Sequence, residues 1–262
     1  MKQISLEESK KIQCDILKNV DAFCRKNGIN YSLCYGTLIG AIRHKGFIPW
    51  DDDIDIMMPR KDYDLFINKY KDEYYNLLSH HTNKNWPFLY SSIEDPNTIT
   101  YYGEHKSVRG VWVTIIPVEN IRNENISKMV SFLNFYEKKI IRLKHSYWTP
   151  NTNILYNLAK AICRLLLLPV PCSSFIKYVE NKLKYNQSTG VLGCPSVWMI
   201  DNRIITYQEN IFSSFIDVEF EGMKCMSLSG YHEYLQIEYG DYMTPPPIEE
   251  QVPKHGFTAY WK

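Results

Sequence analysis

The segment Trp50-Asp-Asp-Asp-Ile-Asp-Ile56 decides the fold of this chain. In a strand, successive side chains point to opposite faces, so Asp53 and Asp55 are expected on one face with Ile54 and Ile56 buried behind them. Two carboxylates about 6–7 Å apart repel each other unless a cation or a shared proton intervenes. Mg²⁺ or Mn²⁺ takes such oxygen ligands and sits between carboxylates and substrate phosphates. The pattern predicts a metal site at Asp53 and Asp55 for phosphoryl chemistry, with a solvated acidic turn as the alternative.

The residues before this segment favour the metal site. An apolar run over 29–35 predicts a strand, Gly36-Thr37 ends it, and 38–44 predicts a short helix. A glycine at such a junction lets backbone N–H groups approach a phosphate, and a helix N-terminus carries partial positive charge. A strand, a Gly-Thr pair, a short helix and an Asp-x-Asp strand, in that order, are typical of nucleotidyltransferase active sites. Three basic side chains lie just before the acidic strand: Arg43, His44 and Lys45.

Two blocks of sequence resemble the LicD family, which is similar to nucleotidyltransferases and related to fukutin-related proteins. The first block runs from Gly36 to Arg60, and the second is the Tyr-Gly-Asp-Tyr-Met and Pro-Pro-Pro segment within residues 231–247. The resemblance touches roughly residues 5–120 and 215–255. It implies an enzyme that moves phosphocholine, or a related phospho-alcohol, from a CDP-linked donor such as CDP-choline to a hydroxyl of a cell-surface glycan. The acceptor would belong to lipopolysaccharide, capsule or teichoic acid and could be lipid-linked.

The motif and the resemblance together lead to a hypothesis for the roles of individual residues. Asp53 and Asp55 hold one or two metal ions, and Asp51 and Arg43 act in catalysis, Arg43 by neutralising the departing nucleotide. The expected substrate-binding residues are Gly36, Thr37, His44, Lys45, Trp50, Tyr239 and Asp241. For Trp50 the alternative is anchoring to the core, and for Tyr239 and Asp241 it is packing of a C-terminal turn.

Thr114 departs from the family pattern, which has a third aspartate at this position, and Glu119 replaces a later aspartate. A hydroxyl binds a divalent cation far less strongly than a carboxylate. Three hypotheses follow: Asp53 and Asp55 suffice with the donor diphosphate, another acid such as Asp51 or Glu104 contributes, or the protein binds the donor without turning it over. A nucleotidyltransferase that releases pyrophosphate is a further alternative.

Composition and cysteine usage favour a globular cytoplasmic protein. The chain has 262 residues and a net charge of +1, so no global field argues for nucleic acid as a partner. Seven cysteines without a Cys-x-x-Cys pair suggest neither a disulfide framework nor a zinc knuckle. The N-terminus shows no apolar signal-peptide segment. We therefore expect a cytoplasmic location, with the inner face of the membrane as a place of action.

The order of the expected helices and strands, together with the resemblance, implies an α+β fold, a nucleotidyltransferase-like mixed sheet flanked by helices with a helical insertion. We expect a catalytic core over 1–120, a helical region that contacts the acceptor over 121–210, and a C-terminal segment over 211–262 that packs back on the core. Helices are expected over 6–26 and 60–78, and two or three more over 126–186. Strands are expected over 87–93, 98–102 and 110–118.

The apolar helix expected over 154–168 allows two interpretations. Its length and the charges of Lys160 and Arg164 exclude a spanning helix. A buried core helix is the favoured interpretation. The alternative is an interfacial helix that makes peripheral contact with the membrane, which would suit a lipid-linked acceptor.

Overall fold

A mixed β-sheet forms the centre of the computed structural model, which describes residues 1–262 except 104, 123–125, 136–152, 186, 197–204 and 254. Its main path runs β10 (Thr206–Gln208), β9 (Val191–Gly193), β8 (Trp112–Asn120), β3 (Ile54–Pro59) and β2 (Ser32–Leu33). Strands β3 and β8 are parallel, whereas β2 is antiparallel to β3. The strand β5 (Ser91–Glu94) pairs with the start of β8 and with β4 (Asn76–Leu78). The fold is α+β, as the sequence predicts.

The first helix follows its capping signals. Helix α1 (Leu6–Asn27) begins after Ser5, whose hydroxyl accepts the N–H of Glu8 at 3.1 Å, and ends at Gly28 with φ 63°. Its apolar face packs on the sheet and on α3 (Arg60–Lys69), where the Phe23 and Phe66 rings meet edge to face at 5.6 Å. The sheet and these helices enclose the main hydrophobic core.

Several element boundaries differ from the sequence prediction, and the strand expected over 87–93 begins only at Ser91. The strand expected over 29–35 is only Ser32–Leu33, and the next helix, α2 (Tyr35–His44), begins at Tyr35 with φ 48°, so Gly36 and Thr37 lie in its first turn. The helix expected over 60–78 ends at Lys69. Asp72 ends it locally because its carboxylate accepts the N–H groups of Tyr74 and Tyr75 at 2.8 and 3.0 Å, which favours a turn.

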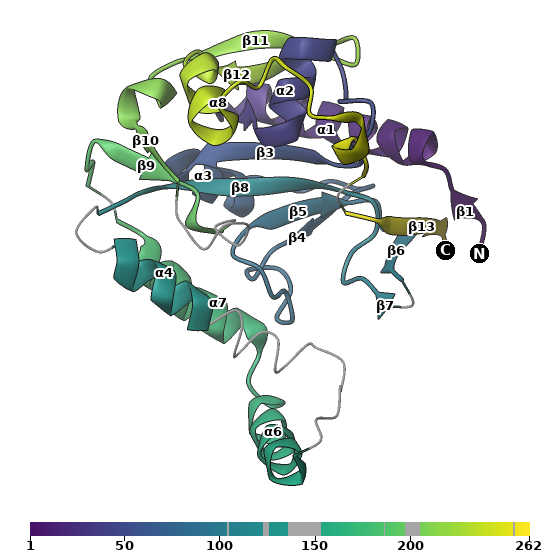
Figure 1. The fold of residues 1–262 in the computed structure, drawn as a ribbon, viewed down its shortest axis with the longest axis vertical. Coiled ribbons are helices and arrows are strands. Elements are labelled where there is room, and N and C mark those ends of the chain that lie inside the picture. Colours follow the sequence, from purple (N-terminus) through teal and green to yellow (C-terminus); the bar gives the residue numbers. More distant parts are fainter. Residues whose placement is uncertain (104, 123–125, 136–152, 186, 197–204, 254) are drawn as a thin grey trace.

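The two ends of the chain meet in a second sheet with the order β1 (Gln3–Ile4), β13 (Phe257–Trp261), β6 (Thr98–Tyr102) and β7 (His105–Lys106). All its pairs are antiparallel, and Gln3 lies opposite Tyr260. The hairpin of β11 (Phe215–Phe220) and β12 (Met223–Leu228) packs on the main fold, since the N–H of Leu228 donates to Ser32 Oγ at 3.0 Å. Helix α8 (Tyr231–Tyr239) contacts α2. The C-terminal segment therefore reaches both sheets (Figure 1).

In the described part of the region between β8 and β9, the chain forms three helices. Helices α4 (Ile126–Phe135) and α7 (Cys172–Leu183) lie side by side and contribute to a small separate core that includes Leu133, Ile176 and Val179. Helix α6 (Ile154–Leu167) stands apart at the far end of the molecule (Figure 1). None of its residues is buried, so the interpretation as a core helix is wrong. Among the described residues, no single helix is long and apolar enough to cross a bilayer; α6 and α7 pass that test only as a pair bent by 85°.

Candidate active site

The acidic strand places its apolar and acidic residues as the alternation predicts. Ile54 and Ile56 are fully buried, which contributes about 1.5–3 kcal/mol for each side chain. Asp53, just before β3, is 7% exposed, and Asp55 is partly buried within it. The charges of the two carboxylates act on each other, as expected for residues two apart along a strand.

The Gly-Thr pair holds the helix against this strand. The buried hydroxyl of Thr37 accepts the backbone N–H of Asp55 at 2.9 Å, which fixes the first turn of α2 beside β3. A Cβ on Gly36 would lie 2.5 Å from Asp51 Oδ2, so only glycine lets that carboxylate lie against the start of the helix. The partial positive charge of a helix N-terminus favours an anion there. Both residues therefore position carboxylates, a role that the sequence analysis did not include.

Burial and mutual repulsion raise the pKa values of the three carboxyl groups. Burial, followed by the charges of Asp55 and Asp52, raises the pKa of Asp51 to about 6. Burial and then the charge of Asp55 raise the pKa of Asp53 well above its usual range. Burial also raises the pKa of Asp55, although a hydrogen bond from Thr114 opposes the shift. Clustered acids with this destabilisation of their ionised forms are a favourable site for a cation.

One histidine that the sequence analysis missed joins the cluster. His255, in the loop before β13, lies with Nδ1 2.8 Å from Asp52 Oδ1 and Nε2 3.4 Å from Asp53 Oδ2. The hydrogen bond to Asp52 raises the pKa of His255 to about 9, against the opposing effect of burial. Asp52, Asp53 and His255 lie close enough together to share a metal ion. No local signal in the sequence connects residue 255 with residue 53.

The donor set fits a hard divalent cation, because carboxylate oxygens dominate it. Asp53 and Asp55 are the predicted ligands, and Asp52 and His255 extend the set on the side of Asp53. The buried position of Asp53 and its repulsion by the charges of Asp55 and Asp51 provide the structural reason for a cation here.

Thr114 lies directly opposite Asp55 in the parallel register of β3 and β8. Its hydroxyl donates to the Asp55 carboxylate and accepts the indole N–H of Trp112 at 3.1 Å. The side chain therefore supports Asp55 at the position where the family pattern has an acid. Glu119, which stands at the position of the later acid of that pattern, does not take the place of the missing third acid. It binds Arg60 at the far end of β8. Glu104 lies outside the described residues.

A second cation near the carboxylates was also missed. The guanidinium of Arg109 lies 3.7 Å from the centre of the Trp112 ring and donates to Ser92 Oγ at 3.0 Å. Its charge favours the ionised form of Asp55. Arg109 directly precedes the Gly-Val-Trp strand, but a single arginine in a loop carries no recognisable signal.

The predicted basic cluster points mainly toward the C-terminal segment. Arg43 donates from Nη1 to the Tyr242 carbonyl at 2.9 Å and from Nε to His44 Nε2 at 2.9 Å. Lys45 is exposed and has φ 60°, and its carbonyl accepts the N–H of Glu221 at 2.9 Å. These contacts connect α2 with α8 and with the β11–β12 turn. Substrate contacts of Arg43, His44 and Lys45 stay predictions.

The remaining predicted residues have structural contacts of their own. Trp50 is partly buried and packs against the main core. Tyr239 ends α8 at 43% exposure, and the neighbouring charge of Glu238 acts on its hydroxyl more strongly than those of Asp55 and Asp51. Asp241 is exposed and accepts the hydroxyl and N–H of Thr244 at 2.6 and 3.3 Å, which stabilises the turn before Pro245. Substrate contacts of Trp50, Tyr239 and Asp241 also stay predictions.

Comparison with known proteins bears on the same segments. The family model described as LicD/FKTN/FKRP, nucleotidyltransferase domain, matches residues 28–172. A lipopolysaccharide cholinephosphotransferase LicD from Haemophilus influenzae is 32% identical over 99% of both chains. Two uncharacterized proteins, from Rickettsia typhi and Rickettsia prowazekii, are 38% and 45% identical over 24% and 18% of this chain and over 20% and 18% of their own lengths. The family match and the full-length relative agree, and the chain belongs to the LicD family.

Proposed function

We propose that this protein is a metal-dependent phosphotransferase. It moves phosphocholine, or a related phospho-alcohol, from a CDP-linked donor to a hydroxyl of a cell-surface glycan. The observation that carries the proposal is the buried group of carboxylates at the joint between β3 and α2, in a chain whose full-length relative is named a lipopolysaccharide cholinephosphotransferase.

Asp53 and Asp55 are the residues that would hold Mg²⁺ or Mn²⁺. Such an ion neutralises the charge of a diphosphate and polarises the phosphorus that is attacked. The start of α2 offers backbone N–H groups for a phosphate oxygen, with Gly36 allowing close approach. Arg43 and Arg109 supply positive charge for the departing nucleotide.

Asp51 is our candidate for the group that receives the proton of the attacking hydroxyl. Its carboxylate lies against the first turn of α2, on the same acidic segment as Asp53. A positioned base contributes about 10²–10⁴-fold to the rate of such transfers. Thr114 cannot take this role in an enzyme of this kind, since its hydroxyl is already hydrogen-bonded to Asp55 and Trp112.

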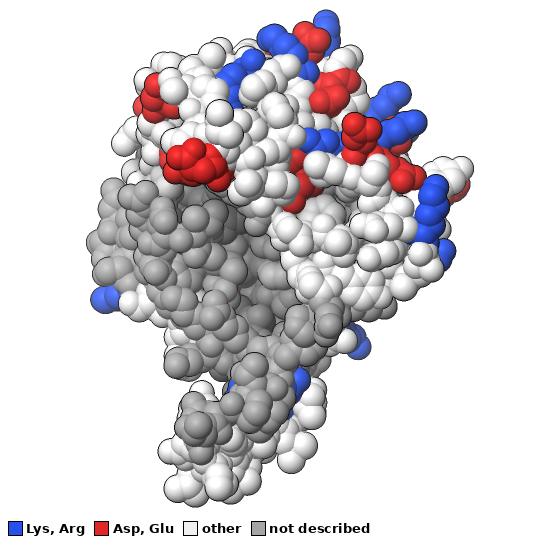
Figure 2. Space-filling model, turned by 45° about the vertical axis from the view of Figure 1, so that its right-hand side comes forward, with Lys and Arg blue, Asp and Glu red and all other residues white. Residues whose placement is uncertain are grey.

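Peripheral contact with a membrane is part of the proposal, because a lipid-linked acceptor lies at a bilayer surface. Helix α6 supports it. The helix carries Lys160 and Arg164, and no acidic residue occurs between 154 and 171. Figure 2 shows Lys and Arg (blue) among uncharged residues (white) on the described surface at that end of the molecule, and no Asp or Glu (red). Its apolar side chains that are at least half exposed are Ile154, Leu155, Leu158, Ile162, Leu165 and Leu166.

A second candidate function is donor binding without turnover, and only Thr114 favours it.

Product analysis distinguishes a phosphotransferase from a nucleotidyltransferase and from a binding protein. The protein is incubated with Mg²⁺, CDP-choline or another CDP-alcohol, and a lipopolysaccharide or other glycan acceptor. The proposal predicts CMP together with a phosphodiester on the glycan. Pyrophosphate released from a nucleoside triphosphate would indicate a nucleotidyltransferase. Donor binding without transfer to any acceptor would leave the binding protein as the better description.

A further inference from the structure

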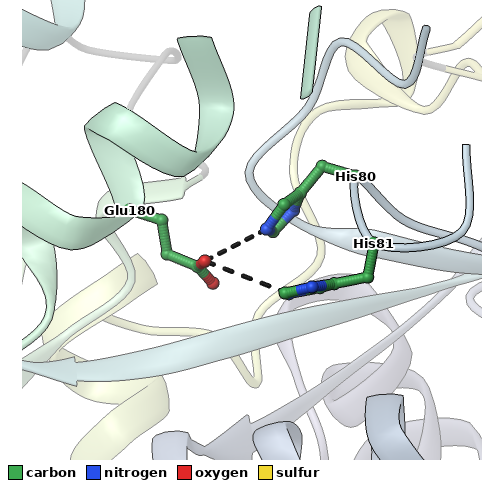
Figure 3. Close-up of side chains that lie close together, drawn as sticks. All are labelled: His80, His81 and Glu180. Atoms are coloured by element: carbon green, nitrogen blue, oxygen red, sulfur yellow. Dashed lines mark hydrogen bonds and ion pairs between the residues drawn. The ribbon is translucent and has the colours of Figure 1, made fainter. Parts of the chain in front are cut away.

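A second group of metal-binding side chains lies outside the candidate active site. His80 and His81 occupy the turn after β4, and Glu180 projects toward them from α7 (Figure 3). Glu180 Oε2 lies 3.0 Å from His80 Nε2 and 4.0 Å from His81 Nε2. His80 and Glu180 are buried, whereas the side chain of His81 is 40% exposed. The three groups therefore meet at a place that solvent can reach from one side.

Backbone contacts hold the two histidines in place. Ser79 Oγ accepts the N–H of His81 at 3.2 Å, and Thr82 Oγ1 donates to the Leu77 carbonyl at 2.7 Å. The N–H of Ser173, in the first turn of α7, donates to the Lys84 carbonyl at 3.0 Å. The turn and the helix that carries Glu180 are thus joined independently of the three side chains.

The two oxygens of Glu180 have separate partners. Oε1 accepts Arg60 Nη1 at 3.0 Å and lies 3.6 Å from Lys184 Nζ, whereas Oε2 faces the histidines. Arg60 also binds Glu119 and Asp64, and Lys184 lies 3.3 Å from Asp64. The ion pairs of Glu180 with Arg60 and Lys184 thus both involve Oε1. Oε2 faces the two imidazoles and offers them a carboxylate oxygen for a shared cation.

A buried histidine–glutamate pair without a metal is the simpler interpretation, and one observation argues against it. The second imidazole, that of His81, also approaches the same oxygen of Glu180, which a simple pair does not need. Ligand atoms around a tetrahedral Zn²⁺ lie about 3.3 Å apart, and the 3.0 and 4.0 Å separations bracket that distance.

We infer that His80, His81 and Glu180 bind a transition-metal dication such as Zn²⁺. Two imidazoles and one carboxylate suit Zn²⁺ rather than the Mg²⁺ proposed for the oxygen-rich site at Asp53. Solvent beside His81 provides the remaining coordination position. The ion joins the β4–β5 turn to α7 and so fixes the helical region against the sheet. This site is separate from the proposed function and stands if that function fails.

Zinc titration of the metal-stripped full-length protein tests the inference. The Asp53→Asn variant serves as background, because Asp52, Asp53 and His255 could also bind Zn²⁺. The inference predicts one tightly bound Zn²⁺ per chain in this background, and an affinity at least about 10-fold lower after His81→Ala. His232→Ala is the matched control, since His232 lies outside both groups and bonds to the Tyr242 hydroxyl. It should leave the affinity unchanged.

Two further readouts do not depend on activity. Co²⁺ in place of Zn²⁺ should give a visible absorption spectrum that His81→Ala abolishes, and Zn²⁺ should raise the Tm of the background protein but not that of the His81→Ala variant. The inference is overturned if the background protein binds no Zn²⁺, or if His81→Ala binds it equally well. Because His81 is exposed, its replacement should not prevent folding.

Discussion

At the scale of single residues, the candidate site depends on small side chains that place carboxylates. Gly36 makes room for Asp51, and Thr37 and Thr114 form hydrogen bonds to the backbone and the side chain of Asp55. Local alternation was enough to predict that Ile54 and Ile56 are buried beside Asp53 and Asp55; the metal-binding role of the two aspartates stays a prediction. His255 and Arg109 could not be predicted, because they reach the site through strand pairings between distant segments.

Thr114→Asp restores the acid of the family pattern. A third carboxylate beside Asp55 should destabilise the metal-free protein by about 1–3 kcal/mol, because its charge is added to a buried acidic cluster. With Mg²⁺, the same change should increase turnover and enlarge the stabilisation by metal. Urea unfolding and product formation, each with and without Mg²⁺, measure these effects.

Thr114→Asn is the matched control for that variant, since it has a similar shape without the charge. It should show neither the greater metal dependence nor the higher turnover. Equal Mg²⁺ responses of the Asp and Asn variants would show that residue 114 does not reach the metal.

Gly36→Ala tests the contact between Asp51 and the start of α2. The added Cβ would lie 2.5 Å from Asp51 Oδ2, so the carboxylate must move. We expect kcat to fall at least about 10-fold, as positioning losses commonly do, while the Tm changes little. An unchanged kcat would remove Asp51 from the mechanism.

At the scale of secondary-structure elements, a side-chain hydrogen bond joins α2 to β3, next to the backbone bond from the capping residue Cys34 to the Asp55 carbonyl. Thr37→Val keeps the shape of the side chain but removes the oxygen that accepts the N–H of Asp55. The buried N–H then lacks a partner, which should lower the free energy of unfolding by about 1–3 kcal/mol. Thr37→Ser retains the oxygen and should lose less stability in urea titrations. Equal losses would mean that packing, not the hydrogen bond, holds the two elements together.

Some helix and strand boundaries could be predicted from sequence patterns, and others could not. Helix α1 was predictable because both of its caps are local, and the β6 boundaries match the expected 98–102. The end of α3 was not predictable from the sequence. The apolar periodicity of the helix continues beyond Lys69 into residues that the hydrogen bonds of Asp72 hold in a turn. The position of α6 depends on which neighbours cover it, and periodicity does not contain that information.

Helix α6 should bind a lipid surface. The full-length protein is expected to co-sediment with vesicles containing anionic lipid, and Leu165→Glu/Leu166→Glu should abolish this, because both side chains are 68% exposed and apolar. An environment-sensitive probe on Cys163, the exposed cysteine of this helix, should report an apolar environment when vesicles are added.

Tyr74→Glu provides the control for vesicle binding, since Tyr74 is equally exposed but lies outside α6. It should bind vesicles like the unmodified protein. If the α6 double variant and the control bind equally well, α6 is not the lipid contact.

At the scale of the whole molecule, distant parts of the chain converge on β3. The N-terminal helix contributes Gln13, whose Nε2 donates to the Asp52 carbonyl at 3.0 Å, and the C-terminal segment contributes His255. The pairing of β1 with β13 brings the two ends together. The α+β class was predictable from the order of the elements, whereas this convergence was not, because it depends on strand pairing across the whole chain.

Binding of Mg²⁺ by Asp53 and Asp55 is the central claim, and thermal unfolding with and without Mg²⁺ and CDP-choline tests it most directly. The unmodified protein should gain stability from the two together, because they bind only the folded state. Asp53→Asn and Asp55→Asn should remain folded, lose this gain and lose transfer activity. Asp217→Asn, which changes an exposed acid on β11, should behave like the unmodified protein. If both site variants retain the Mg²⁺-dependent gain and the activity, the metal site lies elsewhere.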